Sequence, residues 1–320
     1  MLSASLPDGG TVRLSLNNPN FLGVANFRGE RRYQEDFYSF SALSLDPEEL
    51  RLSYKKAYNI DWDPSALPAP LARQLLFVGI YDGHGGSTVS QFLRQELHGL
   101  FEHVDKSHTP DVYAWAKELG GYFRRFNGGV LSPWIDPSAS SYQEQLDLEA
   151  RATLAFFEVD KVMSQEKETK ECGATASVIL LKSLDNLGYF QSNRLALTVA
   201  HVGLGDLKFK PFGVTPEPEV RHMLLEGKQW SHITLISDGV SSVVSDEEVS
   251  DLARGALSPK HAAERICSFA EDMGSEDNQT ALVVPLAGWG KITGPDRTLE
   301  LREYRRKGME GNERHRGRWM

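Results

Sequence analysis

The chain has 320 residues, of which 40% are hydrophobic and 25% charged, with 35 Lys and Arg against 44 Asp and Glu and a formal net charge of −9. This composition is typical of a globular protein large enough to bury a substantial core. The acidic balance argues against a nucleic-acid partner held by phosphate neutralisation and against attachment to an anionic membrane surface. No apolar stretch reaches the ~20 residues of a membrane-spanning helix, so we expect no membrane insertion.

Continuous apolar runs predict strands that are buried on both faces. The first run is 75–81, and it ends in Asp82-Gly83. Four further runs of the same kind are 175–181, 195–202, 233–236 and 280–285. Ser237-Asp238 follows the run 233–236, and Asp277-Asn278 precedes the run 280–285. Acidic residues thus occur repeatedly at the ends of predicted strands.

Helices are predicted between some of these runs. Apolar residues recur at helical spacing over 87–100, where Ser87 can cap the helix, and over about 144–165. Ser245 and Glu248 form a capping box, and Ser258-Pro259 opens a further helix that Gly274 could close.

Two irregular stretches are predicted to be surface insertions, 45–72 because it is rich in Pro, Asp and Tyr, and 127–141 because it is rich in Gly, Ser and Pro. No linker separates the central motifs, so we expect one main domain over 23–287. An N-terminal extension over 1–22 precedes it and a charged C-terminal tail over 288–320 follows it.

The chain has 2 cysteines, Cys172 and Cys267, without the spacing of a metal site. This pattern fits a reducing intracellular compartment and two structural thiols. His201, His222 and His232 also lack ligand spacing, and we interpret them as structural.

Short acidic fragments adjoin the apolar runs: Gln34-Glu35-Asp36, Asp82-Gly83-His84, Gly205-Asp206, Ser237-Asp238-Gly239 and Glu276-Asp277-Asn278. A turn or a helix cap explains any one of them. Their repetition at strand ends instead favours a site assembled from distant carboxylates. Oxygen donors without thiols or clustered histidines suit Mg²⁺ or Mn²⁺ rather than zinc or iron.

Several motifs follow one another in a fixed order: Arg31-x-x-x-Glu35-Asp36, Asp82-Gly83-His84-Gly85-Gly86, Cys172-Gly173-Ala174-Thr175-Ala176, Ala200-His201-Val202-Gly203, Ser237-Asp238-Gly239 and Asp277-Asn278. In this order, from about Gly23 to Leu286, the chain resembles the metal-dependent Ser/Thr protein phosphatase family, type 2C. The segments Ile236 to Ser241 and Val214 to Glu219 are similar to those of fungal forms assigned to mitochondria. The expected compartment is therefore the cytoplasm or the mitochondrion.

The resemblance implies an α+β fold, a two-layer antiparallel β-sandwich flanked by helices, with two Mg²⁺ or Mn²⁺ ions in a cleft at one end. It implies phosphorylated proteins as substrates, whose phosphoserine and phosphothreonine are hydrolysed by a water activated between the ions. By position, Asp82 would bridge the two ions, Asp238 and Asp277 would bind the first, Glu35 and the Gly83 carbonyl would bind the second, and Asp36 would support them through water. Arg31 would hold the phosphate, and His84 would be the general acid.

The chemistry of the reaction agrees with these roles. A phosphomonoester is an anion, so two cations about 3.5–4 Å apart can acidify a water and offset charge on the phosphoryl oxygens. The leaving alkoxide needs a proton, which a histidine can supply near neutral pH. The chain has no Cys-x₅-Arg loop and no Gly-x-Ser-x-Gly elbow, which argues against a thiol phosphatase and against another ester hydrolase.

One departure from the family pattern follows Gly203. In the family, Asp-Ser/Thr-Arg and a second hairpin strand come next, whereas here Leu204-Gly205-Asp206 looks like the end of a later Ser/Thr-Arg-Ala-x-Gly-Asp segment. The intervening stretch is missing, as in a shortened transcript or gene model. One sheet is therefore expected to be incomplete, and Asp206 would replace the lost aspartate, a ligand of a further metal, only by accident. The alternative function is a catalytically impaired pseudophosphatase that acts as a binding or regulatory protein.

Overall fold

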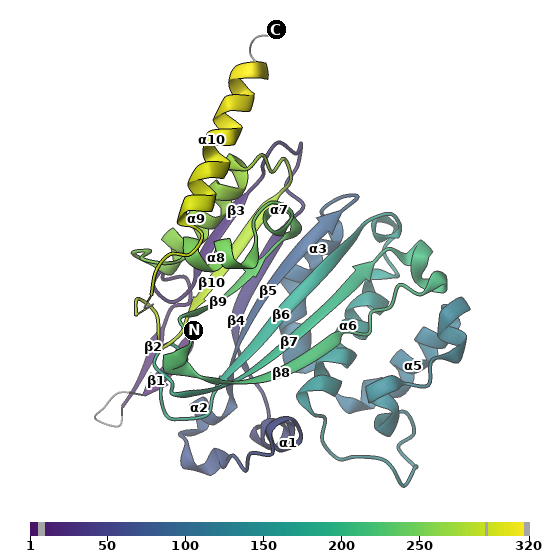
Figure 1. Cartoon of the computed structure of the whole chain (residues 1–320). Helices are drawn as coiled ribbons and strands as arrows, with labels where there is room; N and C mark the ends of the chain where they lie inside the picture. Colours follow the sequence, from purple (N-terminus) through teal and green to yellow (C-terminus); the bar gives the residue numbers. More distant parts are fainter. Residues whose placement is uncertain (6–9, 292–293, 317–320) are drawn as a thin grey trace.

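Two antiparallel β-sheets lie face to face at the centre of the computed structural model, which describes residues 1–5, 10–291 and 294–316 (Figure 1). The larger sheet has five strands in the order β4-β5-β6-β7-β8, and the smaller has three in the order β3-β10-β9. Their bounds are β3 Gly23–Phe27, β4 Phe37–Ser44, β5 Gln74–His84, β6 Gly173–Ser183, β7 Arg194–Gly205, β8 Glu219–Glu226, β9 His232–Ile236 and β10 Gln279–Pro285. A separate hairpin pairs β1 (Leu2–Ser5) with β2 (Thr11–Leu14).

Helices cover the outer face of each sheet, which confirms the predicted α+β sandwich (Figure 1). The helices are α1 Pro47–Tyr58, α2 Ala69–Arg73, α3 Thr88–Phe92, α4 His98–His103, α5 Thr109–Glu118, α6 Leu148–Met163, α7 Asp238–Ser241, α8 Asp246–Leu252, α9 Pro259–Asp272 and α10 Leu299–Arg316. A π-helical turn joins α3 to α4 over Leu93–Leu97. The 3-10 helices are Pro64–Ala66, Lys106–His108, Gly121–Arg125, Gly129–Trp134, Lys167–Lys170, Leu207–Phe212 and Gly227–Gln229. Among the residues that the structure describes, no helix is both long and apolar enough to cross a lipid bilayer.

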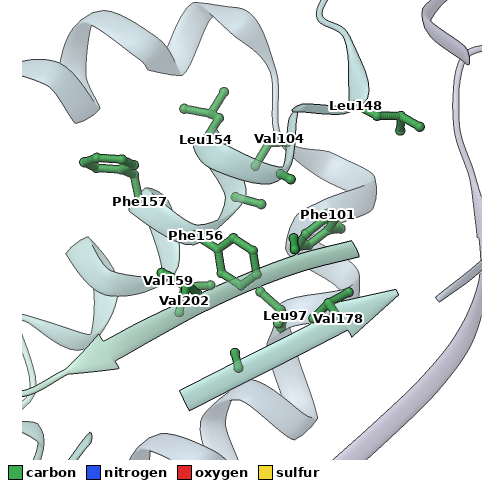
Figure 2. Close-up of a cluster of buried hydrophobic side chains, with 14 of the residues drawn as sticks. Leu97, Phe101, Val104, Leu148, Leu154, Phe156, Phe157, Val159, Val178 and Val202 are labelled. Carbon is green, nitrogen blue, oxygen red and sulfur yellow. The ribbon is translucent and has the colours of Figure 1, made fainter. Parts of the chain in front are cut away.

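Strand β5 explains why continuous apolar runs mark the central strands. Its alternate side chains point to opposite faces, so Leu76 and Val78 join the core between the sheets, while Phe77 and Tyr81 join the core under the helices. Figure 2 shows part of this second core, where Phe101, Phe156 and neighbouring side chains of α4 and α6 pack over the sheet. All five predicted strands are present, each extended by one to three residues at one or both ends.

The predicted helices are also present, with differences at their ends. Ser245 and Glu248 form the expected capping box of α8, and the Ser258 hydroxyl accepts the His261 amide at the start of α9. The helix predicted over 87–100 is interrupted by the π turn. Ser87 does not cap it, because its hydroxyl accepts a hydrogen bond from the Gln91 side chain (2.7 Å) and makes no capping contact.

The two stretches predicted to be surface insertions also contribute side chains to the core. Stretch 45–72 contains α1, which buries Leu50 and Tyr54 against the larger sheet's core. Asp46-Pro47 determines where α1 begins, since the Asp46 carboxylate accepts the Glu48 amide at 2.9 Å and proline fits the first helical turn. In 127–141, Trp134 is 2% exposed and belongs to the same core.

Both predicted terminal segments contact the domain. Leu2 and Leu16 of the N-terminal extension lie in the core between the sheets. In the C-terminal tail, Arg305 of α10 lies 2.6 Å from the Glu248 carboxylate of α8 and packs over the Phe269 ring of α9. The domain limits at 23 and 287 stay a prediction.

The stretch after Gly203 continues β7 to Gly205 and then forms the 3-10 helix Leu207–Phe212. The chain next returns as β8, which pairs with β7 from Arg194↔Glu226 to His201↔Glu219. Within the described residues, β8 and β9 each have one partner strand and therefore form sheet edges. The departure lies in β7 of the five-stranded sheet, and the expectation that one sheet is incomplete stays a prediction.

Candidate active site

A cavity of about 460 Å³ opens where β5 and β9 end and β10 begins. Its walls come from segments that are far apart in sequence. The predicted site residues that line it are Arg31, Glu35, Asp82, Gly83, His84, Asp238 and Asp277.

Asp82 and Gly83 lie near the C-terminal end of strand β5, directly after its apolar run. A Cβ at Gly83 would lie 2.5 Å from the Glu35 carbonyl oxygen and 2.6 Å from the Ser90 hydroxyl, so a larger residue would push the Glu35 loop away. Glycine is thus required for the close approach of Glu35 to the strand.

Asp238 begins α7, and its backbone N–H donates to a carboxylate oxygen of Asp82 at 3.2 Å. The pKa of Asp82 is raised to about 6, first by burial, with the charge of the neighbouring Asp238 adding to the effect and its N–H donor opposing it. The two carboxylates therefore share one crowded region of negative charge.

Asp277 accepts a hydrogen bond from the Arg31 guanidinium at 2.7 Å, in an ion pair whose arginine side chain is 56% exposed. The next residue, Asn278, fixes the loop that carries Arg31 and Glu35. Its side-chain carbonyl accepts the Glu35 amide at 2.7 Å, and its amide donates to the Tyr33 carbonyl at 3.1 Å.

Asp36 does not line the cavity. Asp36 is 2% exposed, and its carboxylate accepts the Thr280 hydroxyl at 2.9 Å. Burial raises the pKa of Asp36 to about 7, and the charges of Asp82 and Asp238 contribute in the same direction. Asp36 is therefore close to the predicted site but is not exposed to the cavity.

His84 lines the cavity, and its side chain is 56% exposed. Its Nε2 is 2.8 Å from a carboxylate oxygen of Asp206, the residue that follows β7. The sequence alone did not predict this contact.

The family model of protein phosphatase 2C matches residues 204–279. Protein phosphatase 2C homolog 4 of Schizosaccharomyces pombe is 26% identical over 360 aligned positions, which cover 92% of this chain and 88% of that protein. Mitochondrial protein phosphatase 1K of Xenopus laevis is 26% identical over 70% of this chain and 64% of its own length. The chain is therefore similar to members of the protein phosphatase 2C family.

These similarities bear on the departure after Gly203. The family match begins at Leu204, the residue where the expected junction lies. The alignment with the S. pombe protein runs over 360 positions although this chain has 320 residues, so that relative carries residues that this chain lacks. Among solved structures, serine-threonine phosphatase 2C from Toxoplasma gondii has a TM-score of 0.47 and 13% identity, over 83% of this chain and 94% of that chain.

The cavity also contains residues that the sequence analysis missed. His201, interpreted as structural, lines it, and its Nδ1 lies 2.7 Å from the Ser177 hydroxyl. The strand ladder explains this placement, because Ser177 pairs with Ile80 on one side and His201 on the other, and all three line the wall. The alternation of Ala200-His201-Val202 was the available signal, since it puts His201 on the opposite face from two buried residues.

The donor set fits hard divalent cations. The lining residues supply carboxylates from Glu35, Asp82, Asp238 and Asp277, and the described part of the chain places no cysteine among them. In the described residues, no three His, Cys, Asp or Glu side chains are arranged closely enough to hold an ion.

Proposed function

We propose that the chain hydrolyses phosphoserine and phosphothreonine in proteins with the help of two Mg²⁺ or Mn²⁺ ions. The observation that supports this most is the shared cavity. Glu35, Asp82, Asp238 and Asp277 come from separate parts of the sequence and line one space of about 460 Å³ together with a cation, Arg31, and a proton carrier, His84.

In the proposal, Asp82, Asp238 and Asp277 would hold one ion, and Asp82, Glu35 and the Gly83 carbonyl would hold the other. Asp36, which does not line the cavity, would support them through water. When bound, two such cations supply an acidified water and positive charge for the phosphoryl oxygens. The raised pKa of Asp82 supports the assignment, because crowded and partly buried carboxylates gain most from a cation placed between them.

The chain's own residues would handle the substrate. The Arg31–Asp277 ion pair is exposed, and such pairs contribute only about 0–1 kcal/mol, so Arg31 is free to turn to the phosphate. His84 gives a proton to the leaving serine or threonine oxygen as the phosphorus–oxygen bond breaks. Water supplies the new oxygen on phosphorus and the proton that restores His84, so one phosphomonoester and one water yield one alcohol and one inorganic phosphate.

The test is Mn²⁺-dependent release of phosphate from a phosphoserine peptide. We expect turnover with Mn²⁺, none after chelation, and a loss of at least about 100-fold in Asp82→Asn and Asp238→Asn. Asp61→Asn, which removes a surface carboxylate with 79% side-chain exposure, is the matched control and should be unaffected. Turnover that persists in chelator, or in both site variants, would contradict the proposal.

The missing stretch after Gly203 favours one alternative, a pseudophosphatase that binds phosphoproteins or a regulatory partner without turnover. A folded sample that binds Mn²⁺ and hydrolyses no phosphopeptide would support this alternative.

For the compartment, we propose the cytoplasm or the mitochondrion, the latter because the X. laevis relative is named as mitochondrial. Imaging of a fluorescent fusion distinguishes them.

A further inference from the structure

The His84–Asp206 contact crosses a strand. In the larger sheet, His84 at the end of β5 pairs with Gly173 of β6, and Gly173 pairs with Gly205 at the end of β7. Asp206 follows Gly205 directly, so its carboxylate reaches back over β6 to the His84 ring at 2.8 Å.

Gly173 provides the space for this contact. A Cβ at Gly173 would lie 2.5 Å from the carboxylate oxygen of Asp206 and 2.8 Å from Nε2 of His84. Any side chain there would occupy the place where the two groups meet. Strand β6 therefore has no side chain at Gly173, the position over which Asp206 and His84 meet.

The backbone of Asp206 is held in an unusual conformation that aims its side chain. Its φ of 48° and ψ of 42° lie in the left-handed region, which aspartate and asparagine adopt more readily than most residues. Its N–H donates to the Cys172 carbonyl at 3.1 Å, and its own carbonyl accepts the Phe209 amide at 2.8 Å. The residue is thus fixed at both of its peptide groups.

A buried ion pair anchors the same turn to α6. Asp160 accepts the Gly205 amide at 3.0 Å, and its other carboxylate oxygen lies 2.8 Å from Nζ of Lys210. Both side chains are completely buried, so a missing partner would leave an uncompensated charge. Gly205 and Lys210 lie on either side of Asp206 in sequence, and Asp160 therefore holds the turn at both ends.

We propose that Asp206 is a positioning residue that orients His84 across Gly173, with Asp160 and Lys210 fixing Asp206 in place. A carboxylate can only accept, so the hydrogen of the contact belongs to Nε2 of His84. The proton for the leaving oxygen then comes from Nδ1. This inference rests on the proposed phosphatase function, in which His84 is the acid.

Two variants of Asp206 test the proposal without straining the backbone. Asp206→Gly removes the carboxylate and suits the left-handed conformation, whereas Asp206→Asn keeps an acceptor at the same place. Lys208→Ala, an exposed change in the same 3-10 helix, is the control.

The kinetic measurement compares a phosphoserine peptide with 4-nitrophenyl phosphate, whose leaving group needs no proton. We expect Asp206→Gly to lower kcat for the peptide by about 10–100-fold, part of the ~10²–10⁴-fold that general acid catalysis supplies. The kcat for 4-nitrophenyl phosphate should change less than about threefold, because its departure needs no general acid. Asp206→Asn should restore much of the peptide rate, and the loss should disappear in a His84→Ala background. Equal losses on both substrates, or full multiplicative losses in the double variant, would overturn the positioning role.

Nitrogen NMR of the histidine rings provides a readout that does not depend on turnover. We expect the hydrogen of neutral His84 on Nε2 in the natural chain and a mixture of both tautomers in Asp206→Gly. A His84 ring that is unchanged by Asp206→Gly would overturn the contact itself. If the natural chain hydrolyses neither ester while the ring signal responds, the phosphatase function and the catalytic role fail and the contact alone is upheld.

Discussion

At the scale of single residues, the cavity depends on side chains that touch no substrate. Asn278 binds the backbone of the Glu35 loop through both ends of its amide group, and Ser90 donates to the Glu35 carbonyl at 2.6 Å. Glu35 is thus fixed through its backbone while its carboxylate faces the cavity. The Asp277-Asn278 pair therefore combines a candidate ligand with the residue that positions another one.

His232 leads to a prediction about pH. Its ring packs edge-on against Trp289, and burial lowers its pKa from 6.5 to about 4. The unfolded chain takes up this proton at higher pH than the folded one, so stability falls as pH drops from about 6.5 towards 4. Between pH 7 and pH 4.5 the free energy of unfolding of the natural chain should fall, and we expect this fall to be smaller by on the order of 2–3 kcal/mol in His232→Gln. Urea unfolding of both chains at the two pH values measures it.

His103→Gln is the control for this measurement, because His103 is exposed on α4. The control should keep the full pH dependence of the natural chain. An identical pH dependence in His232→Gln would show that other groups cause the acid sensitivity.

At the scale of elements, α1 and α6 are joined by a buried ion pair between Glu49 and Arg151. The Arg151 guanidinium also donates to the Phe101 carbonyl at 2.8 Å and to the Val104 carbonyl at 3.2 Å. One side chain therefore connects α1, α6 and the end of α4 over the larger sheet. The segment predicted as a surface insertion is in fact anchored to the core.

Adjacent glutamates on α1 give a matched pair of variants. Glu49→Ala leaves a buried guanidinium without its countercharge and should lower the free energy of unfolding by about 3–5 kcal/mol. Glu48→Ala removes only an exposed pair with Arg51 and should cost at most about 1 kcal/mol. Denaturant unfolding of both variants measures the difference, and equal costs would contradict a structural role for the buried pair.

The strands were more predictable than the site because their signal is local. The run 75–81 is apolar at every position, since β5 is buried on both faces. Strand β4 was not predicted, because serines alternate with its aromatic residues and most of its positions are half-buried. The sequence indicated which acids belong to the site, but the Arg31–Asp277 and His84–Asp206 pairs join residues far apart in sequence and follow only from the packing of the sheets.

At the scale of the whole molecule, the candidate ligands connect both sheets. Asp82 belongs to the larger sheet, whereas Asp238 and Asp277 adjoin strands of the smaller one. Ions bound between them would link the two layers of the sandwich. Unfolding would break that link, so the folded state should gain stability from the metal.

Thermal unfolding with and without Mn²⁺ measures this gain. At an Mn²⁺ concentration of 100 times Kd we expect about 2.7 kcal/mol of stabilisation, or a rise in Tm of about 5 °C. Asp238→Asn should abolish most of the rise, and Asp61→Asn should keep it. A Tm that does not respond to Mn²⁺ in the natural chain would count against a formed metal site.

Strand β7 passes the junction at Gly203 and Leu204 without a break in its ladder with β6, from Thr175↔Gly203 through Ala174↔Leu204 to Gly173↔Gly205. Strand β7 is therefore continuous across Gly203 and Leu204. In a chain with additional residues between Gly203 and Leu204, this ladder would end two pairs earlier and Asp206 would leave the neighbourhood of His84. The hydrogen-bond partner of His84 would therefore depend on whether such residues are present.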